Sequence, residues 1–196
     1  MNLPNKLTAS RFALTVAFLA VMFSQVKFHQ TIALVLFVAA GITDLLDGEI
    51  ARRRKLITNF GILMDPLADK IMVCSAFIAF VGLGWMPAWM VIIVVARELA
   101  ITGLRLLAAS KNVVLAAERY GKHKTISQIV AIIAVLVWQS YHQWGRAGDL
   151  VFGWTIQNRP WVEWFSHLSE WAAVILTFVS GWVYLWKNRV LYLSDM

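Results

Sequence analysis

The chain has 196 residues, of which 60% are hydrophobic and only 15% are charged. This length predicts one domain over residues 1–196, and long apolar runs with sparse charge exclude an ordinary soluble protein. The net charge of +7 does not indicate nucleic-acid binding, because the basic residues gather in the short connections between apolar runs. The composition therefore predicts an all-α integral membrane protein with membrane lipids, and no nucleic acid, as partners.

Six apolar runs follow a short basic juxtamembrane segment at residues 1–11. The first run has 15 residues and the other five have 19 to 24, near the length of about 20 that a helix needs to cross a bilayer. The first lacks a small-residue cleavage site and is interpreted as an uncleaved span. The predicted transmembrane helices are Phe12 to Val26, Thr31 to Ile50, Phe60 to Leu83, Ala88 to Ala109, Lys124 to Trp144 and Leu168 to Trp186.

The connections between these runs carry the turn signals. Residues 82–87 contain two glycines and a proline and predict a turn. Residues 145–160 are polar with Gly and Trp and predict a loop at the membrane interface, and residues 161–167 are interpreted as an interfacial turn. Cys74 lies inside an apolar run and is interpreted as a small buried residue.

Lysine and arginine are distributed unequally between the two ends of the predicted spans. One side has only Lys27, Arg146 and Arg159. The other has Lys6, Arg11, Arg52, Arg53, Arg54, Lys55, Lys111, Arg119, Lys122, Lys124, Lys187 and Arg189. Because basic loops remain on the cytoplasmic side, this bias predicts that both termini are cytoplasmic.

Four carboxylates fall at helical spacing at the cytoplasmic ends of the second and third spans. They are Asp44, Asp47, Asp65 and Asp69. Residues three or four apart share a helix face, so two facing helices would bring all four together. Bare carboxylates would repel, and Mg²⁺ or Mn²⁺ suits their oxygens. Two divalent ions in such a site can assist phosphate displacement.

This stretch resembles the signature of the CDP-alcohol phosphotransferase family, D-x2-D-G-x2-A-R-x8-G-x3-D-x3-D. Every fixed position is filled, by Asp44, Asp47, Gly48, Ala51, Arg52, Gly61, Asp65 and Asp69. The resemblance implies the CDP-alcohol phosphotransferase fold with six transmembrane helices. It also implies metal binding by the four aspartates, with Asp69 as the base that takes a proton from the attacking hydroxyl.

The same stretch supplies the predicted nucleotide and diphosphate contacts. Gly48 and Ala51 lack bulk and would allow a ligand to approach the helix closely. Arg52 can offer a bidentate fork to a phosphate, and Gly61 suits a close helix crossing. The full predicted set is Asp47, Gly48, Ala51, Arg52, Gly61 and Thr8.

Cations further along the chain are candidates for binding a phosphate on the acceptor alcohol. Arg97 and Glu98 lie mid-span, where charge is costly, and Glu98 is interpreted as half of a structural ion pair. Arg105 lies eight residues beyond Arg97 on nearly the same helix face. Lys122 and Lys124 are either phosphate ligands or positive-inside anchors. The predicted acceptor-phosphate set is Arg105, Lys122, Lys124 and Arg11.

A narrower resemblance concerns the acceptor. Residues 3–11, 96–98, 102–105 and 121–125 are similar to segments of bacterial phosphatidylglycerophosphate synthases. The resemblance implies transfer of the phosphatidyl group of CDP-diacylglycerol to the 1-hydroxyl of sn-glycerol 3-phosphate, with release of CMP. It further implies a homodimer in the bacterial inner membrane, with the active site facing the cytoplasm.

Two alternatives stay open at the level of sequence. The first is an enzyme of the same chemistry that uses serine, inositol phosphate or phosphatidylglycerol as acceptor, since the acidic stretch does not separate these. The second is a cation transporter or channel, which would place its acids near the midplane on several helices. The bunching of acids at one edge favours the enzyme.

Overall fold

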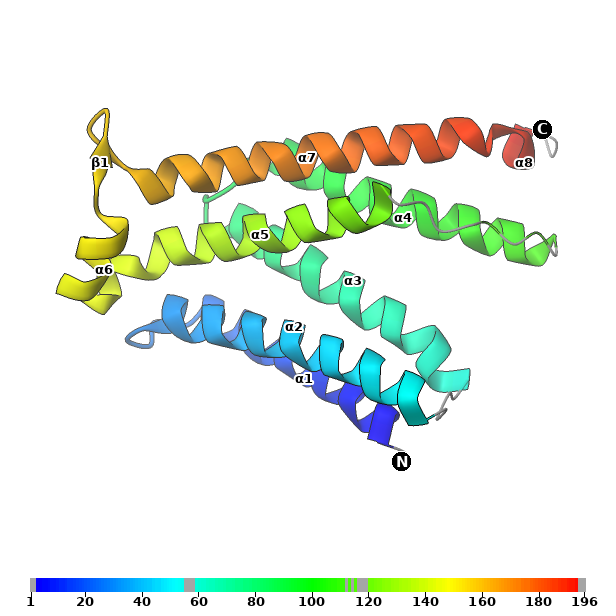
Figure 1. Cartoon of the computed structure of the whole chain (residues 1–196), viewed down its shortest axis with the longest axis horizontal. Coiled ribbons are helices and arrows are strands. Elements are labelled where there is room, and N and C mark those ends of the chain that lie inside the picture. The colour runs from blue at the N-terminus through cyan, green and yellow to red at the C-terminus, as the bar shows by residue number, and fades with distance from the viewer. Residues whose placement is uncertain (1–2, 55–58, 112, 114, 116–119, 194–196) are drawn as a thin grey trace.

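The computed structural model describes residues 3–54, 59–111, 113, 115 and 120–193, with backbone only for 3–8, 44–54, 59–63, 65–66, 120–122 and 193. The described part is mostly helical, which confirms the all-α prediction (Figure 1). Its helices are α1 (Leu3–Met22), α2 (His29–Arg54), α3 (Asn59–Gly82), α4 (Ala88–Ser110), α5 (Tyr120–Ser140), the 3₁₀ turn η1 (Tyr141–Trp144), α6 (Arg146–Phe152), α7 (Trp161–Lys187) and α8 (Arg189–Leu193).

The predicted turn between the third and fourth spans is confirmed. Gly84 has a φ of 72°, a conformation that other residues rarely adopt, and it follows the end of α3. The Trp85 amide then donates to the Phe80 carbonyl at 2.8 Å. Pro87 is extended at the N-cap of α4, where its missing N–H is not needed.

The sequence interpretation was wrong about residues 161–167, which form the first turns of the continuous helix α7 rather than a turn. Pro160 is extended at its N-cap. Polar side chains of this helix have local partners: Glu163 accepts a hydrogen bond from Arg159 of β2 at 2.8 Å, and Ser166 donates to Glu170 at 3.2 Å. Local polarity therefore did not end the helix.

The segment before α7 is more regular than the predicted loop. It contains α6 and a two-stranded antiparallel hairpin of β1 (Thr155–Ile156) and β2 (Arg159–Pro160). The two residues between the strands, Gln157 and Asn158, both have positive φ, as a tight hairpin with right-handed strand twist requires. In Figure 1, this hairpin lies at one end of the long axis, and both chain termini lie toward the other.

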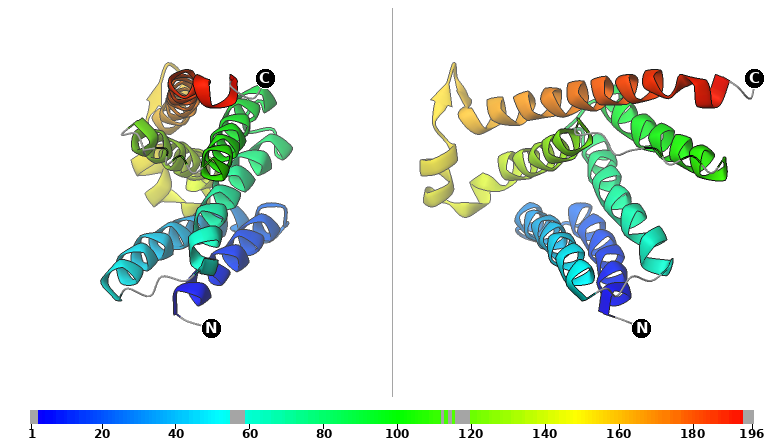
Figure 2. Two further views of the ribbon diagram at one scale, coloured as in Figure 1. Left: turned by 90° about the vertical axis from the view of Figure 1, so that its right-hand side faces the viewer. Right: turned by 45° about the vertical axis from the view of Figure 1, so that its right-hand side comes forward.

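The long helices pack in two groups joined by α3. Figures 1 and 2 show α1 beside α2, and α3 running from this pair toward α4, α5 and α7. One hydrophobic core joins them: Phe18 of α1 meets Phe37 of α2 with ring centroids 5.9 Å apart, and Phe77 and Phe80 of α3 are fully buried. The central place of α3 brings it into contact with α1, α4 and α5.

Side-chain hydrogen bonds join the start of α2 to η1, the turn that follows α5. The Thr31 hydroxyl donates to the Gln143 side-chain oxygen at 2.7 Å, and the Gln143 amide donates to Gln30 at 2.9 Å. The Trp144 indole donates to the Thr31 hydroxyl at 3.0 Å. Together these bonds tie η1 to α2 at the end of α2 remote from Asp44 and Asp47.

Two helices in the described residues are long and apolar enough to cross a membrane, residues 123–144 and α7. The outer face of α7 carries a row of exposed apolar side chains, which is expected of a surface covered by lipid. The row comprises Leu168, Trp171, Ile175, Phe178 and Trp182. The protein therefore has the character of a helical membrane protein.

Candidate active site

The backbone places each predicted pair of carboxylates within one helix. Asp44 and Asp47 belong to α2, and Asp65 and Asp69 belong to α3. The side chain of Asp69 is described and is half-buried. By contrast, some predicted site residues have side chains that lie outside the described residues. These are Asp44, Asp47, Asp65, Gly48, Ala51, Arg52, Gly61, Thr8 and Lys122.

Asp69 lines a cavity of about 260 Å³ between α1, α2, α3 and α5. Arg11 of α1 lines the same cavity and is only 1% exposed. Gly41 of α2 is also in the lining, and it lies three residues before Asp44 on the same helix face. The cavity therefore connects Asp69 with the face of α2 that leads to the acidic stretch.

The rest of this cavity is apolar. Phe37 of α2, Met72 of α3, and Ile129 and Ile133 of α5 form its walls. A pocket with mostly apolar walls and a few charged groups suits a ligand with a hydrocarbon part and a polar reacting part. A lipid with a phosphorylated head group has this composition.

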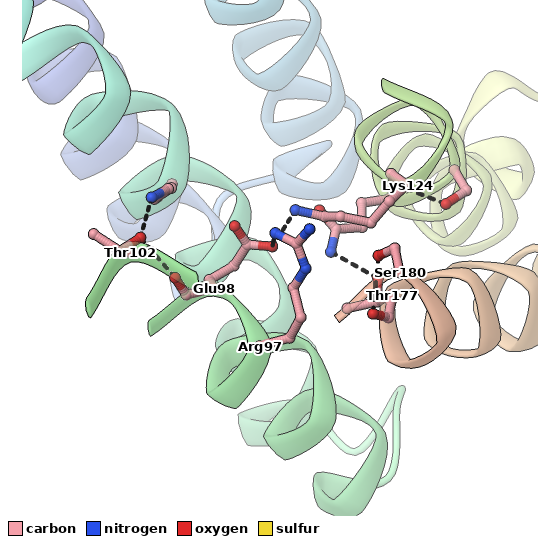
Figure 3. A network of polar contacts seen from close by, with 9 residues as sticks. Arg97, Glu98, Thr102, Lys124, Thr177 and Ser180 are labelled. Carbon is pink, nitrogen blue, oxygen red and sulfur yellow. Dashed lines mark hydrogen bonds and ion pairs between the residues drawn. The ribbon is translucent and has the colours of Figure 1, made fainter. Parts of the chain in front are cut away.

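A polar cluster lies beside this cavity where α3, α4 and α5 meet. Figure 3 shows Arg97, Glu98 and Lys124 pointing toward one another. The Lys124 ammonium donates to the Glu98 carboxylate, and the Arg97 guanidinium lies 3.7 Å from the same oxygen. Lys70 donates to the Thr102 hydroxyl, which in turn donates to the Glu98 carbonyl at 2.7 Å. The predicted structural ion pair of Glu98 is thus confirmed.

The cluster continues onto α7 through neutral groups. The buried Gln128 amide of α5 donates to the Thr177 hydroxyl at 3.0 Å, and the Ser180 hydroxyl donates to the Thr177 carbonyl at 3.1 Å (Figure 3). Sequence reasoning missed Gln128 and Thr177. The available signal was that each is a polar residue inside an otherwise apolar run.

The described side chains of this cluster carry excess positive charge. Arg97 and Lys124 lie at the Glu98 carboxylate, and Lys70 donates to the nearby Thr102 hydroxyl. Lys124 also lies close enough to Asp69 to interact with it electrostatically. In a poorly hydrated environment, an excess of cations favours an anionic ligand, because charges there are screened weakly. The cluster is suited to bind a phosphate close to Asp69.

The predicted acceptor cations differ in their surroundings. Lys124 is only 5% exposed, and its ammonium is held by Glu98. Arg105 is exposed, with its guanidinium 5.8 Å from the centre of the Tyr184 ring. Arg97, which was not among the predicted ligands, has a side chain only 14% exposed and points into the cluster. A mid-span arginine was the signal that could have identified it.

Comparison with known proteins gives consistent similarities. The sequence model of the family described as CDP-alcohol phosphatidyltransferase matches residues 1–179. The chain is 39% identical over 199 residues to the CDP-diacylglycerol–glycerol-3-phosphate 3-phosphatidyltransferase of Bacillus subtilis, with 95% of each chain covered. It is 31% identical over 220 residues to the protein of the same name from Cereibacter sphaeroides, with 99% of this chain and 98% of that one covered.

Proposed function

The chain belongs to the CDP-alcohol phosphatidyltransferase family, and we propose that it is a phosphatidylglycerophosphate synthase. In this reaction, the phosphatidyl group of CDP-diacylglycerol passes to the 1-hydroxyl of sn-glycerol 3-phosphate, and CMP is released. Relatives named for this activity align with almost the whole chain. The activity belongs to phospholipid biosynthesis, on the route to phosphatidylglycerol.

One structural observation supports this proposal above the others. Asp69 lines an apolar cavity, and its sequence neighbour Lys70 belongs to the cationic cluster with Arg97 and Lys124. The reaction needs an apolar cavity and a cationic cluster at the same carboxylate, because the donor is a lipid and the acceptor carries a phosphate. A plain alcohol acceptor such as serine would not require the cationic cluster.

The four aspartates would hold two divalent ions, Mg²⁺ or Mn²⁺. Their donor chemistry fits, since carboxylate oxygens suit these ions, and the backbone sets Asp44 with Asp47 on α2 and Asp65 with Asp69 on α3. The lining of one cavity by both Gly41 and Asp69 supports the closeness of the two helix faces. When bound, such ions neutralise charge on the diphosphate and on the leaving CMP.

In the proposed mechanism, Asp69 accepts the proton of the acceptor's 1-hydroxyl as its oxygen attacks the β-phosphorus. A new oxygen–phosphorus bond forms, the bond from that phosphorus to the CMP oxygen breaks, and CMP leaves. Arg52 would bind the diphosphate with its guanidinium fork. Gly48 and Ala51 would allow close approach to α2, with Asp47, Gly61 and Thr8 completing the donor site.

The acceptor phosphate would be bound by cationic side chains. The predicted ligands Arg105, Lys122, Lys124 and Arg11 remain part of this proposal, and we add Arg97 because its side chain points into the cluster of Glu98 and Lys124. Lys124 has three N–H donors, so its bond to Glu98 leaves capacity for a phosphate oxygen. Glu98 would hold Lys124 in place for that contact.

The proposal is tested by measuring CMP release from CDP-diacylglycerol in detergent with Mg²⁺ or Mn²⁺, and with each acceptor in turn. Release that depends strictly on sn-glycerol 3-phosphate is expected. Release with serine, inositol phosphate or phosphatidylglycerol, and not with sn-glycerol 3-phosphate, would contradict the proposed acceptor and favour another member of the family.

Arg105→Ala is expected to raise the KM for sn-glycerol 3-phosphate by about 10- to 100-fold, since a charged hydrogen bond contributes about 1.5–3 kcal/mol. The KM for CDP-diacylglycerol should change little. Steady-state kinetics with each substrate varied separately measure both values. Arg189→Ala is the matched control, because Arg189 is also exposed and stacked on an aromatic ring, that of Trp186, but lies in α8. Equal effects on both KM values would indicate a structural role for Arg105.

We further propose six transmembrane helices, both termini in the cytoplasm and a single domain over residues 1–196, in the bacterial inner membrane. The active site would face the cytoplasm, and the protein would be a homodimer as the family resemblance implies. The Lys and Arg bias supports this orientation, and the aromatic residues support an interfacial position for the hairpin. The Trp161 and Trp164 indoles donate to the carbonyls of Val151 and Ile156 beside the β1–β2 hairpin, which Figure 1 shows remote from both termini, and indoles favour membrane interfaces.

Cysteine labelling in intact cells should distinguish the two sides of the membrane. In a Cys74→Ser background, Trp154→Cys is expected to react with a membrane-impermeant maleimide applied outside the inner membrane, because Trp154 is 71% exposed in the hairpin segment. Ser110→Cys, at the exposed end of α4, should react only after permeabilisation. The reverse pattern would invert the proposed orientation.

A further inference from the structure

The side chain of Arg97 passes α7 at a glycine. Gly181 is buried in α7, and a Cβ built on it would lie 2.7 Å from Arg97 Cγ, 3.7 Å from Arg97 Cβ and 3.8 Å from Arg97 Cδ. The first distance is shorter than real carbon contacts allow. Any side chain at position 181 would therefore displace the aliphatic part of Arg97.

A glycine inside a helix has an energetic cost that calls for a reason. It destabilises a helix interior by roughly 0.5–1 kcal/mol relative to alanine. Gly181 has helical backbone, so no special φ requires it. The close approach of Arg97 is the feature of the structure that alanine at this position would not allow.

The path past Gly181 determines where the guanidinium of Arg97 lies. It reaches the cluster of Glu98 and Lys124, but its distance of 3.7 Å to Glu98 is too long for a hydrogen bond (Figure 3). Arg97 Nε is buried and has no hydrogen-bond partner among the described residues. The guanidinium of Arg97 is therefore held within the protein and still has N–H groups that can donate hydrogen bonds to a ligand.

We propose that Gly181 is a positioning residue for acceptor binding: its missing side chain leaves the space through which Arg97 reaches the acceptor phosphate. This inference rests on the proposed function. Gly181 itself touches no substrate in this role and acts only through Arg97. The ligand class is a phosphorylated small alcohol, bound by the guanidinium together with the neighbouring ammonium of Lys124.

The first experiment measures the KM of Gly181→Ala for both substrates by CMP release. The KM for sn-glycerol 3-phosphate is expected to rise by about tenfold, the loss of one charged hydrogen bond, with the KM for CDP-diacylglycerol within about twofold of wild type. Gly103→Ala is the matched control. Gly103 is also a helical glycine, it lies exposed in α4, and a Cβ there would meet nothing within 4 Å.

The second experiment asks whether Gly181 acts through Arg97. Arg97→Ala alone should raise the KM for sn-glycerol 3-phosphate, and it also removes the Cγ with which a new Cβ would clash. Adding Gly181→Ala to Arg97→Ala should therefore have no further effect on that KM. If Gly181→Ala lowers the melting temperature of the wild-type protein in detergent, it should not lower the melting temperature of the Arg97→Ala variant. Such non-additivity is the expected sign of one shared contact.

The outcomes separate this inference from the proposed function. If Arg97→Ala raises the KM and Gly181→Ala does not, the positioning role is wrong and the function stands. If Gly181→Ala impairs folding equally with and without Arg97, the glycine serves helix packing and the positioning role is also wrong. A wild-type protein that releases CMP only with a different acceptor would contradict the proposed function, and the positioning role with it.

Discussion

Asp69→Asn is expected to lower the turnover number by about 10²–10⁴-fold, the usual contribution of a general base. Asparagine keeps the size of the side chain but does not accept the proton of the acceptor's 1-hydroxyl. Binding of CDP-diacylglycerol should persist, because the apolar walls of the cavity formed by Phe37, Met72 and Ile133 are unchanged. CMP release measures the turnover, and binding of the radiolabelled donor in detergent measures the affinity.

Asp149→Asn provides the control for this experiment. Asp149 is an exposed carboxylate in α6, 3.3 Å from His142, near the hairpin rather than the proposed site. It should retain wild-type turnover. Asp69→Asn with unchanged turnover would remove Asp69 as the base, and loss of donor binding together with turnover would indicate that its main contribution is to hold the diphosphate.

Glu98→Ala is expected to destabilise the protein by about 3–5 kcal/mol, because removing one partner of a buried ion pair leaves the other charge uncompensated. Here the uncompensated group is the Lys124 ammonium, with Arg97 close by as a second cation. The change should appear as a large fall in the melting temperature in detergent. The variant Glu163→Ala removes a pair with Arg159 that is partly exposed, and should cost at most about 1 kcal/mol.

A second substitution distinguishes an uncompensated charge from a simple loss of packing. Glu98→Met combined with Lys124→Met removes both partners and keeps much of their volume, so it should recover most of the lost stability. Activity is not expected to return, since Lys124 is a proposed phosphate ligand. A double variant as unstable as Glu98→Ala would show that the pair's charge is not what stabilises the contact between α4 and α5.

The helices, and the place of each acidic pair within one helix, could be predicted because they depend on local patterns. Runs of apolar residues bounded by Gly, Pro and basic residues predicted a helix at each of α1 to α5, although α1 begins at Leu3 rather than Phe12 and α5 ends at Ser140 rather than Trp144. The spacing of Asp65 and Asp69 needs only a helix to place both on one face. The ion pair of Glu98 was predictable because a carboxylate inside an apolar run is costly unless it is paired.

Other features depend on contacts between distant segments and had no local signal. Lys124 was predicted as a phosphate ligand or an anchor, and only the packing of α5 against α4 shows that Glu98 holds it. The start of α7 at Trp161 was missed because its polar residues are satisfied within the helix. The contact of Gly181 with Arg97 joins residues on two helices, and no spacing rule relates them.

The bonds among Gln30, Thr31, Gln143 and Trp144 limit how the two helix groups can separate. They fasten α2 to the end of α5 at the pole of the molecule remote from the acidic stretch. Any widening between α2 and α5 must then be greatest at the opposite pole, beside Asp69.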